Sequence, residues 1–185
     1  MILLLSSCAP TAPSSSPEPN PTASIPPSQI PANEIGEVPT TCELEEVVDA
    51  FNERLDGAAF IPTEWQPAEG TDLFEVYEAG GIACTYGIES AEIGGTVMWA
   101  MTSDDVWLAK SMDYKSEGYV AVDIPDLDEH EALVLESMGA DGQAVWYINF
   151  HVRGVWIQFG ASKFITSLED ALAIVEAAAL VTATK

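Results

Sequence analysis

A tight hairpin near the C-terminus constrains the fold more than any other feature of the sequence. Two runs of alternating apolar residues, Val145–Val152 and Val155–Gly160, are separated only by Arg153-Gly154. A two-residue loop fixes the register of an antiparallel pair. This register places three apolar pairs opposite one another: Val152 with Val155, Phe150 with Ile157, and Ile148 with Phe159. One face of the hairpin is then wholly apolar, so the chain must build an antiparallel sheet with a covered face.

The other face of the hairpin is our candidate ligand-binding face. It collects five larger polar or aromatic side chains: Tyr147, Asn149, His151, Trp156 and Gln158. Aromatic and amide side chains on a rigid sheet suit sugars or peptides. The alternative is a structural face that another element partly covers.

Periodicity along the rest of the chain predicts a mixture of helices and strands. Helical spacing or a capping pattern predicts helices over residues 42–55, 103–116, 126–139 and 167–180. Alternation predicts strands over 73–77, 82–89, 96–102 and 119–124, with Gly94-Gly95 as a turn. This order favours an α+β fold, a two-layer antiparallel sheet with helices on one face. Helix, strand, turn, strand and helix follow one another twice, which suggests a diverged αββα duplication.

The chain divides by composition near residue 39. Residues 9–39 hold nine of the twelve prolines and almost no large apolar side chains. Such a segment cannot bury enough surface to offset its chain entropy, so we expect an extended, disordered spacer with an upper reach of roughly 90 Å. Residues 40–185 have the size of a single globular α+β domain.

The first residues carry a targeting pattern. Leu5-Ser6-Ser7-Cys8, followed by Ala9, resembles the lipobox of bacterial lipoproteins, whose cysteine becomes the acylated first residue of the mature protein. The apolar run before it is short and no Lys or Arg precedes it, so we interpret residues 1–7 as a truncated signal-peptide remnant. The resemblance implies lipid attachment at Cys8 and a place on the outer side of the plasma membrane, where two acyl chains hold firmly. The alternative is a short apolar terminus with an incidental cysteine.

Acylation of Cys8 would leave an even pair of cysteines, Cys42 and Cys84. Outside the cytoplasm such a pair is usually a disulfide. Neither cysteine belongs to a CxxC motif and neither has a histidine beside it, which argues against redox or zinc chemistry. We therefore predict a disulfide that joins the first helix to the strand over 82–89.

This cysteine-bearing first helix and the later strand sequence Ala83-Cys84-Thr85-Tyr86 carry a second resemblance. The folded domain resembles small secreted lipoproteins of actinobacteria, including relatives of the extracellular sensor domains attached to their kinases. The resemblance implies an extracytoplasmic domain and transfers no reaction, because those families have none in common.

Charge and missing motifs narrow the function classes. The chain has 30 acidic and 6 basic residues, a formal net charge of −24, which makes nucleic-acid binding improbable. No GxSxG, P-loop, HExxH or Rossmann motif occurs. Two histidines, His130 and His151, give no metal spacing. The densest carboxylate cluster lacks the Gly and the distal Glu of an EF-hand and suits a helix first turn: Asp123, Asp126, Asp128 and Glu129.

We therefore predict no catalytic residue, no metal and no cofactor. The expected function is a membrane-anchored binding or accessory module of the cell envelope, with an envelope protein or a small ligand as partner. The alternatives are an envelope hydrolase acting on wall or sugar polymers and a purely structural envelope protein. Trp65 and Trp107 are candidate binding anchors or, alternatively, packing residues over the core.

Overall fold

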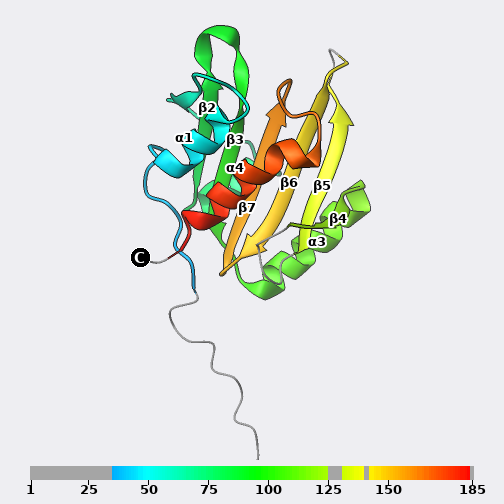
Figure 1. The fold of residues 1–185 in the computed structure, drawn as a ribbon. Coiled ribbons are helices and arrows are strands. Elements are labelled where there is room, and N and C mark those ends of the chain that lie inside the picture. The colour runs from blue at the N-terminus through cyan, green and yellow to red at the C-terminus, as the bar shows by residue number, and fades with distance from the viewer. Residues whose placement is uncertain (1–34, 125–130, 140–141, 184–185) are drawn as a thin grey trace, which may run out of the picture. The chain divides into compact units, whose positions relative to one another are not determined.

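The computed structural model describes residues 35–124, 131–139 and 142–183. Within them one antiparallel sheet has the strand order β1-β2-β3-β7-β6-β5-β4 (Figure 1). The strands are β1 Ala59–Ile61, β2 Ile82–Ile88, β3 Ile93–Met101, β4 Val120–Asp123, β5 Glu131–Met138, β6 Ala144–Val152 and β7 Val155–Ser162. The helices are α1 Glu45–Asn52, α2 Asp72–Glu78, α3 Asp104–Glu117 and α4 Leu168–Leu180, and a short 3-10 helix, η2, spans Glu89–Ala91. The predicted α+β class with an antiparallel sheet is confirmed.

The β6–β7 hairpin has the predicted register. Val152 pairs with Val155 and Phe150 with Ile157, and all four side chains are buried. Both loop residues adopt left-handed conformations, Arg153 with φ 53° and Gly154 with φ 77°. This is the type I′ geometry whose twist matches the flanking strands.

Helices α1 and α4 form the helical layer on one face of the sheet, in front of it in Figure 1. The predicted start of α4 is confirmed, because Ser167 and Asp170 form a capping box. The indole of Trp99 on β3 donates a hydrogen bond of 2.9 Å to the carbonyl of Ala178. The ends of the two helices meet where Arg54 lies 3.3 Å from a carboxylate oxygen of Asp170.

The disulfide between Cys42 and Cys84 is confirmed, with the two Cα atoms 5.5 Å apart. Cys42 lies just before α1 rather than inside its first turn, because the helix begins at Glu45. The hydroxyl of Tyr86 on β2 also donates a hydrogen bond of 3.0 Å to the carbonyl of Cys42. The segment before α1 is therefore fixed to β2 by one covalent and one polar link.

The predicted helix over 126–139 is wrong. Its described part is the strand β5, whose Val134 pairs with Ile148 of β6. Three consecutive residues, Ala132, Leu133 and Val134, are buried, since both faces of this strand are covered, and the alternation that marks a half-exposed strand is lost. The second half of the described chain thus opens with strands, where the suggested duplication needs a helix.

Two further predictions differ from the structure. Residues 73–77 belong to helix α2, whose first turn is capped by the hydroxyl of Thr71, and not to a strand. Gly94-Gly95 lies within β3 rather than in the turn before it, which is made by Glu89–Glu92 instead. The short edge strand β1 carries no alternating pattern and was not predicted.

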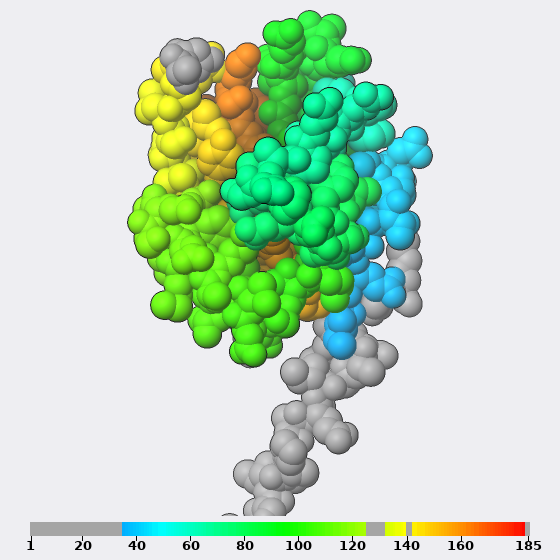
Figure 2. Space-filling model, turned by 180° about the vertical axis from the view of Figure 1, so that it is seen from behind, coloured from blue at the N-terminus to red at the C-terminus, as the bar shows by residue number. Residues whose placement is uncertain are grey.

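Helices α2 and α3 lie on the opposite face of the sheet, which Figure 2 shows from behind, so helices pack on both faces and not on one face as the sequence predicts. A second, smaller apolar cluster lies beneath them and includes Val76 of α2, Tyr114 of α3 and Trp156 of β7. These helices cover only part of that face.

The chain enters the domain at the end of the sheet that holds the β6–β7 turn. The amide of Gly36 donates to the carbonyl of Arg153 at 2.7 Å, and the amide of Glu37 donates to that of Thr182 at 2.9 Å. Among the described helices, none has the length and apolar character needed to cross a membrane.

Candidate functional site

The five residues of the candidate ligand-binding face share one side of the sheet, but four of them are covered. Asn149, His151, Trp156 and Gln158 keep at most 8% of their surface exposed, because α2 and α3 lie over them. Tyr147 is 37% exposed. The face thus divides into a covered inner part and an open outer part that begins at Tyr147.

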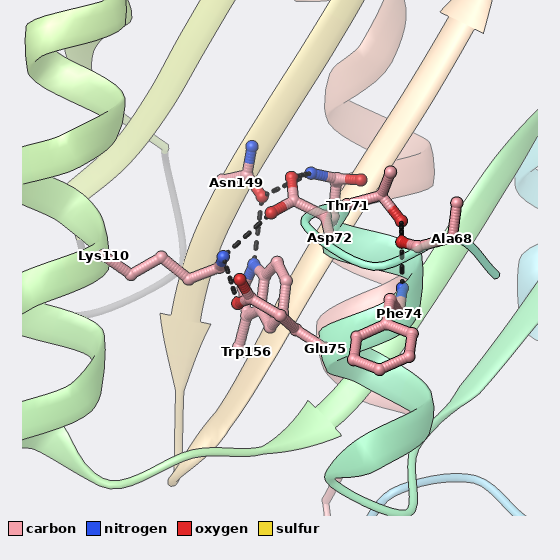
Figure 3. A network of polar contacts seen from close by, with 9 residues as sticks. Ala68, Thr71, Asp72, Phe74, Glu75, Lys110, Asn149 and Trp156 are labelled. Atoms are coloured by element: carbon pink, nitrogen blue, oxygen red, sulfur yellow. Dashed lines mark hydrogen bonds and ion pairs between the residues drawn. The ribbon is translucent and has the colours of Figure 1, made fainter.

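A hydrogen-bond network links the covered part of the sheet to α2 (Figure 3). The side-chain oxygen of Asn149 accepts hydrogen bonds of 3.0 Å from the Trp156 indole and from the Gln158 amide. The Gln158 amide also donates to Asp72 at 2.5 Å. The first residue of α2 is therefore tied to the middle strands of the sheet.

Lys110 connects α3 to the same network. Its ammonium lies 2.8 Å from an oxygen of Asp72 and 2.7 Å from an oxygen of Glu75, and its side chain is 13% exposed. It also lies 4.2 Å from the centre of the Trp156 ring, within range of a cation–π contact. Burial acts to lower the pKa of Lys110, but the hydrogen bonds and charges of Asp72 and Glu75 outweigh it and raise that pKa above its usual value. The lysine stays charged at neutral pH and clamps two helices together.

Two tyrosines lie close to this network, Tyr114 on α3 and Tyr119 just after it. Burial raises the pKa of Tyr119 to about 12 and raises that of Tyr114 further. Their rings are 4.8 Å apart. Both phenols therefore stay neutral near pH 7 and supply neither a base nor a nucleophile there.

The open outer part of this face is a groove of about 680 Å³. Figure 2 shows the molecular surface hollowed there, between the tip of the β2–β3 hairpin and the strands β6 and β7. Its sheet-derived lining includes several residues with small side chains or none: Gly94, Gly95, Gly160, Ala161 and Ser162. A Cβ atom on Gly160 would lie 3.4 Å from the ring of Tyr147, so this ring lies against the glycine. The hollow exists because α2 does not extend over this part of the sheet, and because the strands here carry small side chains.

Strand register explains where the groove begins. Thr85, Thr96, Gly160 and Tyr147 are paired neighbours across β2, β3, β7 and β6, and all four line the groove. The next row of the same face contains Asn149, which α2 and α3 cover. The groove therefore begins at the edge of the buried network, whose Gln158 and Asp72 also line it.

The floor and walls of the groove are mainly apolar. Trp65, on the segment between β1 and α2, lines it and donates its indole hydrogen to the carbonyl of Ala83 at 3.0 Å. Ile61, Leu73 and Met98 contribute further apolar surface. Trp107 has a different place, since it stacks on the ring of His151 with centroids 5.6 Å apart.

Among the described residues that line the groove, the groups charged at neutral pH are all acidic: Asp72, Glu89 and Glu92. Asp72 already binds Lys110 and Gln158 with its two oxygens. Glu89 and Glu92 are exposed at the tip of the β2–β3 hairpin and form no ion pair within the described part of the chain. The groove thus has an apolar floor and an acidic rim.

The other candidates from the sequence lie elsewhere. Asp123 ends the edge strand β4, while Asp126, Asp128, Glu129 and His130 fall outside the described residues. His151 is buried, with Nε2 2.8 Å from the carbonyl oxygen of Thr102. Residues 35–124, 131–139 and 142–183 contain no group of three His, Cys, Asp or Glu side chains arranged to hold a metal ion.

The sequence pointed to Tyr147, Gln158 and Trp65, which line the groove, but not to Asp72, Glu89 and Glu92. Thr71 and Asp72, followed by Glu75, do form a helix-start pattern, which could have identified α2. No protein-family model matches the chain, and no curated protein matches it. The chemistry of the groove itself therefore carries the functional proposal.

Proposed function

We propose that the folded domain is a ligand-binding module of the cell envelope, held on the outer side of the plasma membrane by a lipid on Cys8. The groove is the observation that carries the binding part of this proposal. Its volume of about 680 Å³ and its mainly apolar surface are typical of sites for small molecules. The disulfide is compatible with an oxidising compartment outside the cytoplasm.

The position of the chain entry supports a tethered module. Residues 36 and 37 are held at the end of the sheet that carries the β6–β7 turn, whereas Ile93, Val145 and Ser162 line the groove at the other ends of their strands. Strand β6 has 9 residues, so the two ends are roughly 27 Å apart. The groove therefore lies at the end of the sheet opposite to the point at which a tether from Cys8 would enter the domain.

The residues in the groove favour binding over turnover. The described lining includes neither a histidine nor a cysteine, and its best-placed carboxylate, Asp72, is already bound by Lys110 and Gln158. A nucleophile with an adjacent base, which covalent catalysis needs, is not formed by these residues. We therefore propose a binding module; the alternative is an envelope hydrolase acting on sugar polymers, because that reaction needs a pair of carboxylates and Asp72, Glu89 and Glu92 line the groove.

The groove is tested by filling it. Gly160→Leu should place a side chain beside Tyr147 inside the hollow, whereas Glu45→Leu adds the same side chain at an exposed position on α1. In a thermal-shift screen of small molecules, compounds that stabilise the wild type and E45L should fail to stabilise G160L. At a concentration of about 100 times Kd, the stabilisation should reach roughly 2.7 kcal/mol. Equal stabilisation of G160L by every such compound would refute the groove as the binding site.

The anchor is tested separately. The full-length precursor should fractionate with membranes in its bacterial host, and Cys8→Ala should release it to the soluble fraction. Cys8→Ser serves as a second, smaller change that also removes the acceptor thiol. Unchanged membrane fractionation of both variants would contradict the lipid anchor without affecting the groove.

A further inference from the structure

We infer that the ligand of the groove is a small organic amine, positively charged at one end and apolar over the rest. This inference rests on the proposed function and specifies its ligand. It follows from two properties of one cavity, the sign of its free charges and the apolar character of its floor.

The charges of the groove disfavour an anionic ligand. A carboxylate or phosphate ligand would face Asp72, Glu89 and Glu92, while no lysine, arginine or histidine among the described residues lines the groove. Lys110, which could have balanced a ligand anion, does not line the groove and is already bound to Asp72 and Glu75. An anion entering the groove would lose hydration and gain no opposite charge, so its binding is disfavoured.

The same arrangement locates the positive end of the ligand. The charge of Asp72 is already paired with Lys110, so the lining carboxylates without an ion pair in the described part of the chain are Glu89 and Glu92 at the hairpin tip. These two carboxylates are exposed, and an ammonium group held there would keep part of its water. A rim charge of this kind contributes modestly to affinity and strongly to selection by sign.

The floor and walls of the groove accommodate the apolar part of the ligand. Ile61, Leu73 and Met98 provide aliphatic surface, and the rings of Trp65 and Tyr147 are two aromatic groups in the lining. The small residues of the floor leave room for a flat ring against the strands. A fully hydrophilic polyamine would leave this surface without a partner, so the ligand combines an amine with an apolar body.

A matched trio of probes tests the inference. Naphthylethylamine, naphthylethanol and naphthylacetate share one ring system and differ in charge. Each is titrated into the isotope-labelled protein, and binding is followed by NMR shifts of groove residues such as Thr96 and Tyr147. The amine should bind most tightly, the alcohol less tightly and the carboxylate least, and raising the salt concentration should reduce the difference between amine and alcohol.

A pair of matched variants ties the preference to the rim. Glu89→Gln with Glu92→Gln removes the two free rim charges, and Glu43→Gln with Glu45→Gln removes two exposed charges near α1. The rim variant should bind the amine about threefold to tenfold more weakly and the alcohol unchanged. The control variant should bind all three compounds as the wild type does.

The outcomes separate this inference from the proposed function. If the alcohol or the carboxylate shifts groove residues as strongly as the amine, the groove binds ligands but the amine assignment is wrong. The assignment is also wrong if the rim variant and the control bind the amine equally, or if a lysine-containing peptide binds where the amine does not. If no probe shifts a groove residue, the inference and the small-molecule groove fail together.

Discussion

Replacing Lys110 by methionine should destabilise the domain more than any other single loss of charge at its described basic residues. The substitution keeps a long apolar stem but removes an ammonium that binds Asp72 at 2.8 Å and Glu75 at 2.7 Å. It also removes the cation–π contact with Trp156, 4.2 Å away. Lys110 joins α3 to α2 and to strand β7, so the substitution removes the contacts that link these three elements.

The size of the effect follows from the exposure of the partners. Breaking a fully buried ion pair costs about 3–5 kcal/mol. Here the Lys110 side chain is 13% exposed, but that of Glu75 is 56% exposed and can regain water. Asp72 keeps its hydrogen bond from Gln158. We therefore expect K110M to lower the free energy of unfolding by about 2 kcal/mol.

The assay is urea denaturation at pH 7, with Lys163→Met as the control because Lys163 is exposed and carries the same charge. A double-mutant cycle of K110M with Asp72→Asn should give a coupling energy of about 1 kcal/mol. The pKa of Lys110 is raised in the folded state. The stability that its charge contributes is therefore fully present at neutral pH, and it is lost as the pH rises through the raised pKa of the folded protein. A loss below about 0.5 kcal/mol, equal to that of K163M, would refute the clamp.

Three further predictions concern the rest of the fold. Replacing Cys84 and Cys42 by serine should cost about 4 kcal/mol in urea denaturation, since the disulfide closes a loop with a sequence separation of 42; an unchanged midpoint would contradict this. Asp170→Asn should flatten the loss of stability in acid, because hydrogen bonds from Thr166 lower the pKa of Asp170, whose contribution is present above the usual aspartate pKa and is lost as the pH falls through the lowered value. An unaltered pH profile would count against that role. Gly154→Val, at φ 77°, should destabilise the hairpin by at least about 1 kcal/mol, and native-state hydrogen exchange of β6 and β7 should detect it; unchanged exchange rates would show that the turn bears no strain.

The hairpin was predictable because its information is local. Arg153-Gly154 suits a two-residue turn, and the alternation on both sides agrees with it, so pattern and turn select the same register. The capping box at Ser167 is local in the same sense. Where several adjacent residues favour one geometry, the sequence is sufficient.

The predictions for β5 and α2 were wrong because tertiary packing, and not local sequence, determines the secondary structure of these segments. Ala132, Leu133 and Val134 are buried in succession because both faces of β5 are covered, and such a run has no period to distinguish a strand from a helix. Helix α2 is short, and its first residues also fit a strand pattern. It is fixed in place by Asp72, whose partner Gln158 is 86 residues away.

The groove could be predicted only in part. Tyr147 and Gln158 follow from the hairpin register, but the hollow beside them depends on how far α2 extends over the sheet. Gly94 and Gly95, which indicate a turn by composition, instead belong to strand β3. Because they have no side chains, they leave space above the strand. A cavity is defined by what does not cover it, and no local pattern encodes that.

The disulfide also determines how the domain carries mechanical load. A pull on the N-terminal segment first opens the two hydrogen bonds of residues 36 and 37, and then reaches Cys42. From there the sulfur bridge passes the tension directly to Cys84 in β2. The closed loop between the cysteines, which holds α1, Trp65 and α2, is bypassed by the force. One wall of the groove thus keeps its shape while the chain that leads to it is stretched.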